Sequence, residues 1–144
     1  MSMQRIMVAT DGSVGANRAV EAAAELAKKF DADLLIVTFG GSSSAEEIGK
    51  LARSEGGIGE AIELLSNLIL REARERAERA GAAKIQTSSG WGDAAEGIID
   101  LAHREKADVV VVGRRGRGRL AGLLLGSVSQ KLASLAPCAV IVVP

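Results

Sequence analysis

This chain has few aromatic residues and one cysteine. Aromatic residues make up 2% of its 144 residues, tyrosine is absent, and the cysteine is Cys138. One cysteine excludes a disulfide within the chain and metal sites of the CxxC type. A core with so few aromatic rings must be built from Val, Ile, Leu and Ala. The same shortage argues against a flavodoxin-like electron carrier, whose flavin lies between aromatic rings.

Net charge and long apolar runs are also missing. The 18 basic residues balance the 18 acidic ones, so no overall field attracts nucleic acid or a membrane surface. No apolar run approaches the ~18 residues of a membrane-spanning helix. The first residues, MSMQRIMVATDGS, lack the apolar centre of a signal peptide. We therefore expect a cytoplasmic protein with one domain, 1–144, and neither a membrane nor nucleic acid as its partner.

Five short apolar runs alternate with helical patterns. The runs span residues 5–10, 33–39, 84–89, 108–113 and 138–143. Four are nearly continuous in Val, Ile and Leu, as in strands covered on both faces, whereas the more polar run 84–89 is typical of a sheet edge. Helical spacing predicts helices over 15–30, 58–80, 93–106 and from 126 to before Pro137. This alternation predicts an α/β fold, a parallel sheet with helices on both faces.

Two of these helices have defined inner sides. We expect Phe30 to face the core at the end of helix 15–30. Helix 58–80 is expected to pack through Leu64, Leu65, Leu68 and Ile69. Glu72–Arg76 and Glu75–Arg79, each one turn apart, are expected to face solvent. The Gly- and Ser-rich segment 40–57 is predicted to be a flexible insert around a short helix at 45–53.

Two loops follow strands that we expect to be neighbours. TDGS (10–13) follows the first strand, and GRRGRGR (113–119) follows the fourth. In doubly wound sheets, ligands bind beyond the carboxyl ends of the strands, where the strand order reverses. The second loop lacks the Lys-Ser/Thr of a P-loop. It also lacks the acidic residue that a dinucleotide-binding fingerprint places about 20 residues further on.

The glycine spacing of the second loop fits another signature. Gly113-x2-Gly116-x9-Gly126-Ser127 resembles the ATP-binding signature of the universal stress protein family. The resemblance also includes VATDGS, GDAAEGI, ADVVVVG and the ending GSVSQKLASLAPCAVIVVP. It implies a five-stranded sheet of order 3-2-1-4-5 in the adenine nucleotide alpha hydrolase-like fold, with ATP across the ends of the first and fourth strands. Any Mg²⁺ would be held mainly by the phosphates.

The resemblance also implies a homodimer. We expect it to form through the C-terminal strand, Cys138–Val143, because an open apolar edge favours pairing with another strand. An unidentified protein partner is a second expectation.

The phosphates are expected at the second loop and the last helix. Gly113 and Gly116 leave room for backbone N–H groups to approach phosphate oxygens. Gly126 and Ser127 begin a helix whose unpaired N–H groups favour an anion. The hydroxyls of Ser127 and Ser129 are expected to donate to phosphate.

The other expected site residues surround the sugar and the base. Asp11 faces the ribose, or a metal through water, and Phe39 matches the position that borders adenine in the family. Arg114 and Arg115 depart from the smaller loop of relatives, and they either strengthen phosphate binding, block the site or contact a partner. The expected nucleotide-binding residues are Ala9, Thr10, Asp11, Phe39, Gly113, Arg114, Arg115, Gly116, Gly126, Ser127, Val128 and Ser129.

Three functions stay open on this evidence. The favoured one is an ATP-binding regulatory or stress-response module with at most slow hydrolysis. A slow ATP hydrolase needs a base and a firm metal site, but Asp11 is the only acid in the two loops and the single histidine, His103, lies on the polar side of its helix. A nucleotide-free interaction module would use the arginine-rich loop, which lacks aromatic residues for base stacking.

Overall fold

The structure is a computed structural model that describes residues 2–40, 57–114 and 126–144. Within these residues, five parallel strands form one sheet of order β3-β2-β1-β4-β5, which confirms the expected order. The elements in chain order are β1 (Arg5–Ala9), α1 (Val14–Phe30), β2 (Asp33–Phe39), α3 (Ile58–Arg79), β3 (Ile85–Gly90), α4 (Ala94–Arg104), β4 (Val109–Gly113), α5 (Ser127–Leu135) and β5 (Ala139–Val143). The short helix expected at 45–53 lies outside the described residues.

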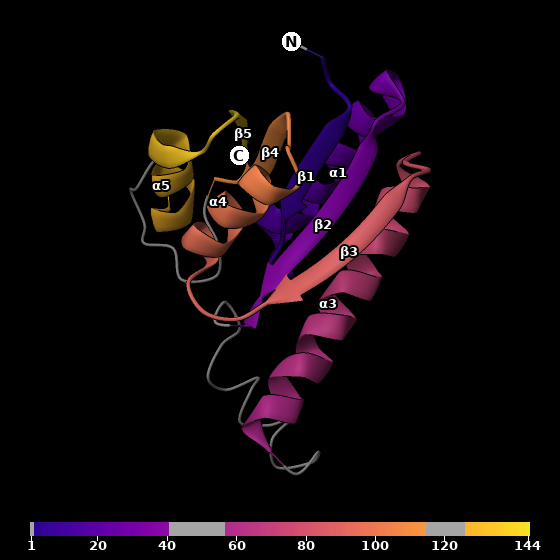
Figure 1. The fold of residues 1–144 in the computed structure, drawn as a ribbon. Helices are drawn as coiled ribbons and strands as arrows, with labels where there is room; N and C mark the ends of the chain where they lie inside the picture. The colour runs from indigo at the N-terminus through magenta and orange to yellow at the C-terminus, as the bar shows by residue number, and fades with distance from the viewer. Residues whose placement is uncertain (1, 41–56, 115–125) are drawn as a thin grey trace.

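Helices cover both faces of the sheet, as the alternation predicts (Figure 1). Successive side chains of a strand point to opposite faces, so the strands feed two separate cores. With α1 and α3, the buried strand residues are Ile6, Val8, Leu34, Ile36, Ile85, Val109 and Val111. With α4 and α5, they are Met7, Val37, Phe39, Val110 and Val112. This double burial explains why these runs are continuous in apolar residues.

Small side chains let α1 lie close to the sheet. Its buried residues are Ala16, Ala19, Val20, Ala23, Ala24 and Ala27. Phe30 is 54% exposed, so the prediction that it faces the core is wrong. It is the last residue of α1, where the chain leaves the helix through Asp31 at φ 52°, and no further turn follows to cover its ring.

The inner side of α3 differs from the predicted one. Ile69 is buried as expected, but Leu64, Leu65 and Leu68 are only half-buried. The first turns of α3 extend beyond the strand ends, where no strand lies against the helix (Figure 1). The buried side is instead formed by Ala61, Ser66, Ile69, Leu70, Ala73 and Ala77.

The outer side of α3 faces solvent as expected, with Glu72, Glu75 and Arg79 exposed. Arg76 is half-buried, and its Nη1 lies 2.7 Å from Glu21 Oε1 of α1. Arg74 pairs with Glu78 at 3.5 Å, one turn further along. Both contacts are partly exposed, and such pairs contribute about 0–1 kcal/mol each. The Arg76–Glu21 contact therefore helps to position α3 against α1, and it contributes little to the free energy of unfolding.

Strands β3 and β5 form the two edges of the sheet, which confirms the edge position predicted for run 84–89. Strand β5 begins at Ala139, one residue later than predicted, and Cys138 before it is half-buried, which raises the pKa of its thiol. Arg114 N donates to Val143 O at 2.7 Å. Since alternate residues of a strand direct their N–H and C=O groups the same way, Ile141 also faces β4, and Val142 faces the open edge.

Asp108 fastens the start of β1 to the start of β4. Its Oδ2 accepts hydrogen bonds from Gln4 N at 2.8 Å and from Arg5 N at 2.9 Å. These two N–H groups favour the ionised carboxylate, and they hold the pKa of Asp108 below its usual value. The amino ends of the two central strands are thereby aligned.

None of the helices in the described ranges is long and apolar enough to cross a membrane.

Candidate functional site

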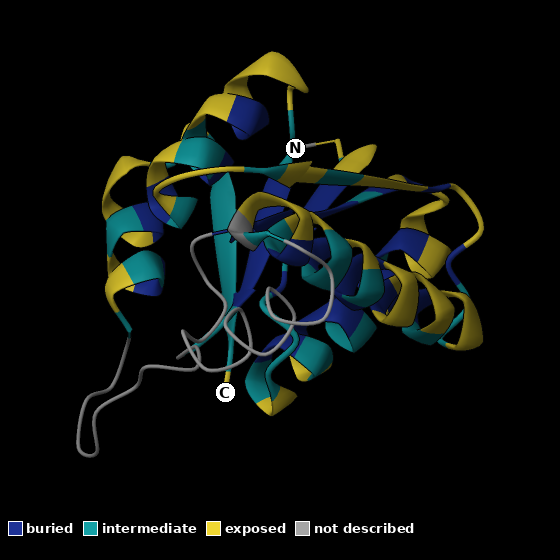
Figure 2. Ribbon diagram, turned by 90° about the horizontal axis from the view of Figure 1, so that it is seen from below, coloured by how far each residue is buried: buried dark blue, intermediate teal, exposed yellow. Residues whose placement is uncertain are grey.

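The carboxyl ends of the central strands bring together residues from distant parts of the sequence. Strand β1 lies between β2 and β4, so Ala9, Phe39 and Gly113 end three neighbouring strands. Figure 2 looks onto this side of the sheet. From β1 the chain proceeds to β2 and β3 on one side, and then to β4 and β5 on the other. This reversal is the position at which open α/β sheets bind ligands.

The TDGS segment forms a tight turn into α1. Thr10 Oγ1 accepts a hydrogen bond from Gly12 N at 3.1 Å, and Asp11 Oδ1 accepts one from Ser13 N at 2.9 Å. Gly12 has a φ of 80°, which favours glycine. Ser13 caps α1, because its Oγ accepts from Ala16 N at 3.2 Å. One carboxylate oxygen of Asp11 therefore stabilises the turn. The expected contact of Asp11 with the ribose or a metal stays a prediction.

Hydrogen bonds fasten the first turn of α5 to the end of β4. Gly126 is the N-cap of α5, and its N–H donates to Arg114 O at 2.7 Å. The Ser129 hydroxyl is buried, and it lies 2.7 Å from Gly113 O and 3.1 Å from Arg114 O. The Ser129 hydroxyl therefore fastens the first turn of α5 to the end of β4, and its expected donation to a phosphate stays a prediction. Ser127 is exposed and Val128 is half-buried.

Two residues at the end of β4 have surroundings that sequence did not reveal. A Cβ added to Gly113 would lie 3.1 Å from Gly15 C and 3.1 Å from Gly15 O. Glycine at 113 therefore lets α1 approach β4, besides any role at phosphate. Arg114 Nε is buried and has no hydrogen-bond partner. Buried donors are nearly always bonded, so this one is available to an anion. Arg115 and Gly116 lie outside the described ranges.

Phe39 ends β2 with its ring packed inside the protein. It is 8% exposed. A Cβ on Gly90 would lie 2.7 Å from Phe39 Cε1, and one on Gly97 would overlap the same ring atom. The two glycines thus form a cradle for the ring, and the signal in the sequence was a glycine inside the otherwise apolar pattern of α4. Contact between Phe39 and adenine stays a prediction.

The cradle yields a stability prediction. We expect Gly97→Ala to lower the free energy of unfolding by about 1–3 kcal/mol, since the new methyl group displaces the Phe39 ring. Gly59→Ala is the matched control in α3, where nothing lies within 4 Å of the added Cβ. That change should be neutral or stabilise by up to ~1 kcal/mol. Urea denaturation measures both, and equal stability of the two variants would contradict the cradle.

The part of the chain that the structure describes holds no cluster of three or more His, Cys, Asp or Glu side chains able to bind a metal. Asp11 lies in the turn that follows β1, and Asp93 and Glu96 pair with Lys131 of α5. A metal there would depend mainly on a ligand's own oxygens, and that expectation stays a prediction.

The fold and the arrangement of its strand ends define an α/β protein of the adenine nucleotide alpha hydrolase-like type. The model of the universal stress protein family matches residues 3–144. The chain belongs to this family. The resemblance recognised in the sequence is therefore confirmed at the level of the family.

Relatives match over nearly the full length. A universal stress protein of Thermus aquaticus is 36% identical, over 96% of this chain and 96% of the relative. One of Mycobacterium tuberculosis, Rv1636, is 34% identical over 96% and 94%. A crystal structure of a universal stress protein in complex with cAMP is 33% identical, with a TM-score of 0.74 over 100% of this chain and 98% of that one. UspA from Lactobacillus plantarum shares the fold at 21% identity, with a TM-score of 0.80 over 100% and 99%.

Proposed function

We propose that this protein is a regulatory module that binds an adenine nucleotide, ATP in the first place, between the ends of β1 and β4. The observation that carries the proposal is the junction of β4 with α5. There the N-terminus of α5, fastened through Gly126 and Ser129, adjoins a buried Arg114 Nε without a partner. A helix N-terminus and a guanidinium N–H both favour phosphate oxygens. The residues present thus fit a triphosphate.

The comparison with a relative supports the adenine base. The relative of known structure that shares 33% of its residues with this chain binds cAMP. In this chain, the TDGS turn and Phe39 lie on the β1 and β2 side of the same strand ends. We assign the sugar to Asp11 and the base to the side of Ala9, Thr10 and Phe39. Any Mg²⁺ is held mainly by the phosphates. The carboxylate of Asp11 is the side-chain group of this set that could also bind it.

Mass spectrometry of small molecules released from the purified protein tests the proposal. ATP in the released fraction supports it, and cAMP supports the adenine site but replaces ATP as the ligand. AMP or ADP favours hydrolysis. If the protein releases no nucleotide and calorimetry detects no binding of ATP or cAMP, the proposal is wrong, and an interaction module that uses the arginine-rich loop takes its place.

Turnover of ATP should be slow, far below the ~10 s⁻¹ typical of enzymes. The site offers Asp11 as its carboxylate, and one oxygen of that group accepts from Ser13 N. His103 is exposed in the last turn of α4, so it is not placed to act as a base. A steady-state assay with Mg²⁺ measures the rate. An ordinary enzymatic rate that Asp11→Ala abolishes would show instead that the protein is an ATP hydrolase.

The proposal includes a homodimer that forms through β5. This strand is an apolar edge, and the N–H of Val142 is directed away from β4. An antiparallel pair of β5 strands would satisfy such groups in both copies. The interface joins the two sheets, and it lies at the edge next to β4, whose carboxyl end forms part of the nucleotide site.

A further inference from the structure

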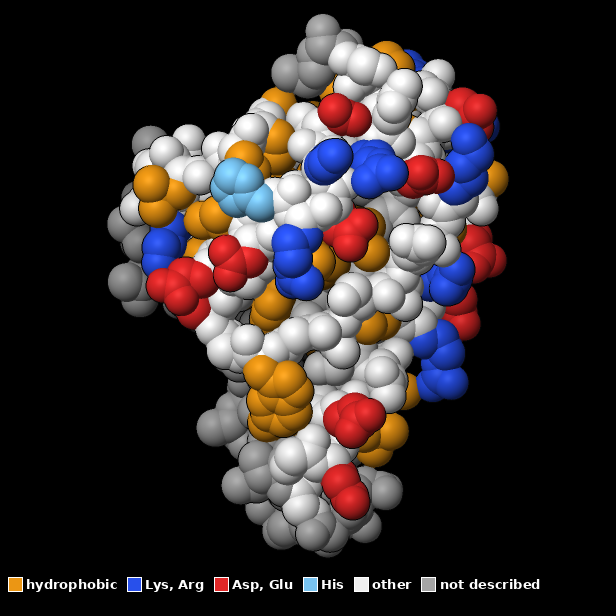
Figure 3. Space-filling view, in the orientation of Figure 1, with side chains coloured by type: hydrophobic (Ala, Val, Ile, Leu, Met, Phe, Trp, Pro, Cys, Tyr) orange, Lys and Arg blue, Asp and Glu red, His pale blue; other side chains and the backbone are white. Residues whose placement is uncertain are grey.

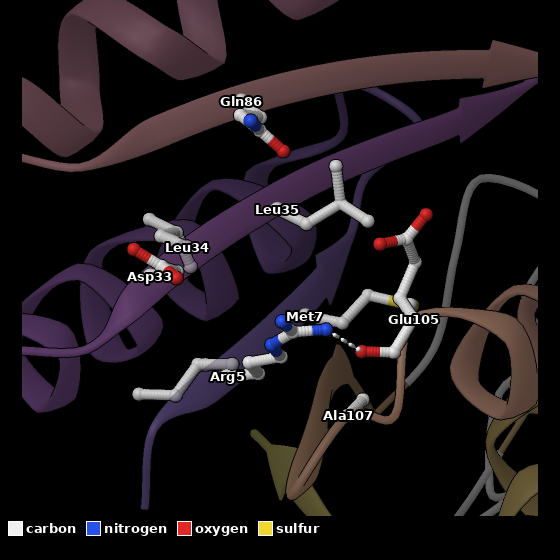
Figure 4. A pocket seen from close by; sticks show the side chains of 9 residues that line it. Arg5, Met7, Asp33, Leu34, Leu35, Gln86, Glu105 and Ala107 are labelled. Carbon is white, nitrogen blue, oxygen red and sulfur yellow. Dashed lines mark hydrogen bonds between the residues drawn. The ribbon is translucent and has the colours of Figure 1, made fainter.

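A pocket of about 290 Å³ lies at the amino ends of β1, β2 and β3, at the opposite end of the sheet from the proposed nucleotide site. It opens on the face that carries α4, where no helix of the described residues covers the amino-terminal parts of β2 and β3 (Figure 1). Figure 3 shows this face with acidic and basic side chains interspersed among apolar atoms. The lining side chains on which the inference rests are those of Arg5, Met7, Asp33, Leu35, Gln86 and Glu105 (Figure 4).

The strand register places these side chains in rows. Met7 pairs with Leu35, and Leu35 pairs with Gln86, so the three lie side by side on one face. Arg5 pairs with Asp33 in the row nearest the strand starts. Met7 is buried, Leu35 is half-buried and Gln86 is exposed. The pocket therefore has an apolar floor that becomes polar toward β3.

Arg5 is held in position at the wall of the pocket. Its Nη1 donates to the main-chain oxygen of Glu105 at 2.9 Å, and its backbone N–H donates to Asp108 Oδ2 at 2.9 Å. A guanidinium has five N–H donors, so further donors are available to a ligand. A preorganised cation of this kind favours a carboxylate, which it can bind through two parallel hydrogen bonds.

Two carboxylates border the same floor. In the view of Figure 4, the side chains of Asp33 and Glu105 lie on opposite sides of Leu35. Within the described ranges, neither carboxylate has an ion-pair partner, and Arg5 is the one guanidinium of the lining. The lining thus offers one positive and two negative groups around an apolar strip.

We propose that this pocket binds a free basic α-amino acid of the lysine, ornithine or arginine class. The α-carboxylate binds Arg5, and the α-ammonium binds the adjacent Glu105 carboxylate. The methylene chain lies on Leu35 and Met7, and the side-chain cation reaches Asp33. The charges of such a molecule, two positive and one negative, complement those of the lining.

Other ligand classes match this lining less well. A phosphate or nucleotide would meet two carboxylates, and the volume is near the lower end of the ~300–1,000 Å³ range of ligand pockets. An apolar amino acid leaves Asp33 without a partner, and a diamine leaves Arg5 without one. The inference does not depend on nucleotide binding, because the two sites lie at opposite ends of the strands.

Calorimetric titration of the whole protein with L-lysine, L-norleucine and cadaverine tests the proposal. Norleucine lacks the side-chain cation, and cadaverine lacks the carboxylate. We expect L-lysine to bind about tenfold more tightly than either, a difference of ~1.4 kcal/mol. Equal affinity for all three, or no saturable binding of L-lysine up to ~10 mM, overturns the assignment.

Single charge removals locate the site. Asp33→Asn and Glu105→Gln should each weaken L-lysine binding about tenfold, and Glu105→Gln keeps the main-chain oxygen that anchors Arg5. Glu75→Gln is the matched control, an exposed carboxylate on α3 outside the pocket. Thermal melts report whether each variant is folded. Lysine affinity unchanged in both pocket variants, or lowered equally in the control, would show that the pocket is not the site.

Discussion

Calorimetric titration of the Gly126→Val variant with ATP should show an affinity at least tenfold below that of the wild type, a loss of ~1.4 kcal/mol or more. Gly126 is the N-cap of α5 at φ −77° and ψ 170°, an extended conformation that valine also adopts. Its N–H bond to Arg114 O can therefore persist. The valine side chain instead occupies space at the helix N-terminus, where a phosphate has to meet the free N–H groups.

A second N-cap glycine provides the control for this variant. Gly57 begins α3 in an extended conformation, and an added Cβ meets nothing within 4 Å. Gly57→Val therefore makes the same chemical change at a helix start away from β4, and it should bind ATP as the wild type does. If folded Gly126→Val also binds ATP as tightly as the wild type, the phosphates lie elsewhere.

Light scattering should find a dimer for the wild-type protein at micromolar concentration and a monomer or an aggregate for Val142→Pro. Proline has no backbone N–H, and the N–H of Val142 is directed to the open edge of β5. The pairing of β5 with β4 does not use that donor, because Ile141 and Val143 are the residues that face β4. Val142→Pro thus tests the interface more selectively than Ile141→Pro, which would remove a donor inside the sheet.

The opposite edge supplies the comparison for the dimer. Leu34 N donates to Lys84 O at 2.8 Å; by alternation along β3, Gln86 then faces β2 and the N–H of Thr87 faces outward. Thr87→Pro removes an outward donor from the edge that the dimer does not use, so that variant should remain a dimer. A monomeric wild-type protein, or loss of the dimer in Thr87→Pro as well, would rule out pairing through β5.

Most of the fold could be predicted because apolar continuity and helical spacing are local properties. Strand β2 matches its predicted bounds, β3 is shifted by one residue, and the other three differ from theirs by one residue at one end. The strand order followed from the family resemblance rather than from spacing. The inner side of α3 could not be predicted, since it depends on where the sheet stops beneath the helix. Leu64 and Leu68 satisfy the helical period, but they are only half-buried.

The candidate site was predicted as a set of residues, and the structure distinguishes their roles. Gly126 and Ser127 begin α5 as expected. Ser129 was assigned to phosphate because it lies near the first turn of the last helix, and the structure adds contacts of its hydroxyl with Gly113 O and Arg114 O. Such a bond joins residues from two elements, so periodicity within either element cannot reveal it. The same holds for Gly113, whose missing side chain makes room for Gly15.

The bond from Asp108 to the start of β1 has a consequence for the order in which the chain can fold. Arg5 and Asp108 are 103 residues apart, whereas β1 meets β2 after a single helix. During synthesis, β1, β2 and β3 can associate while the other side of β1 is still without its neighbour. Closing that side requires a long-range contact, and such contacts are slow to form. Until β4 emerges, the nascent protein therefore exposes the unpaired side of its central strand, which is the interval of greatest risk for aggregation.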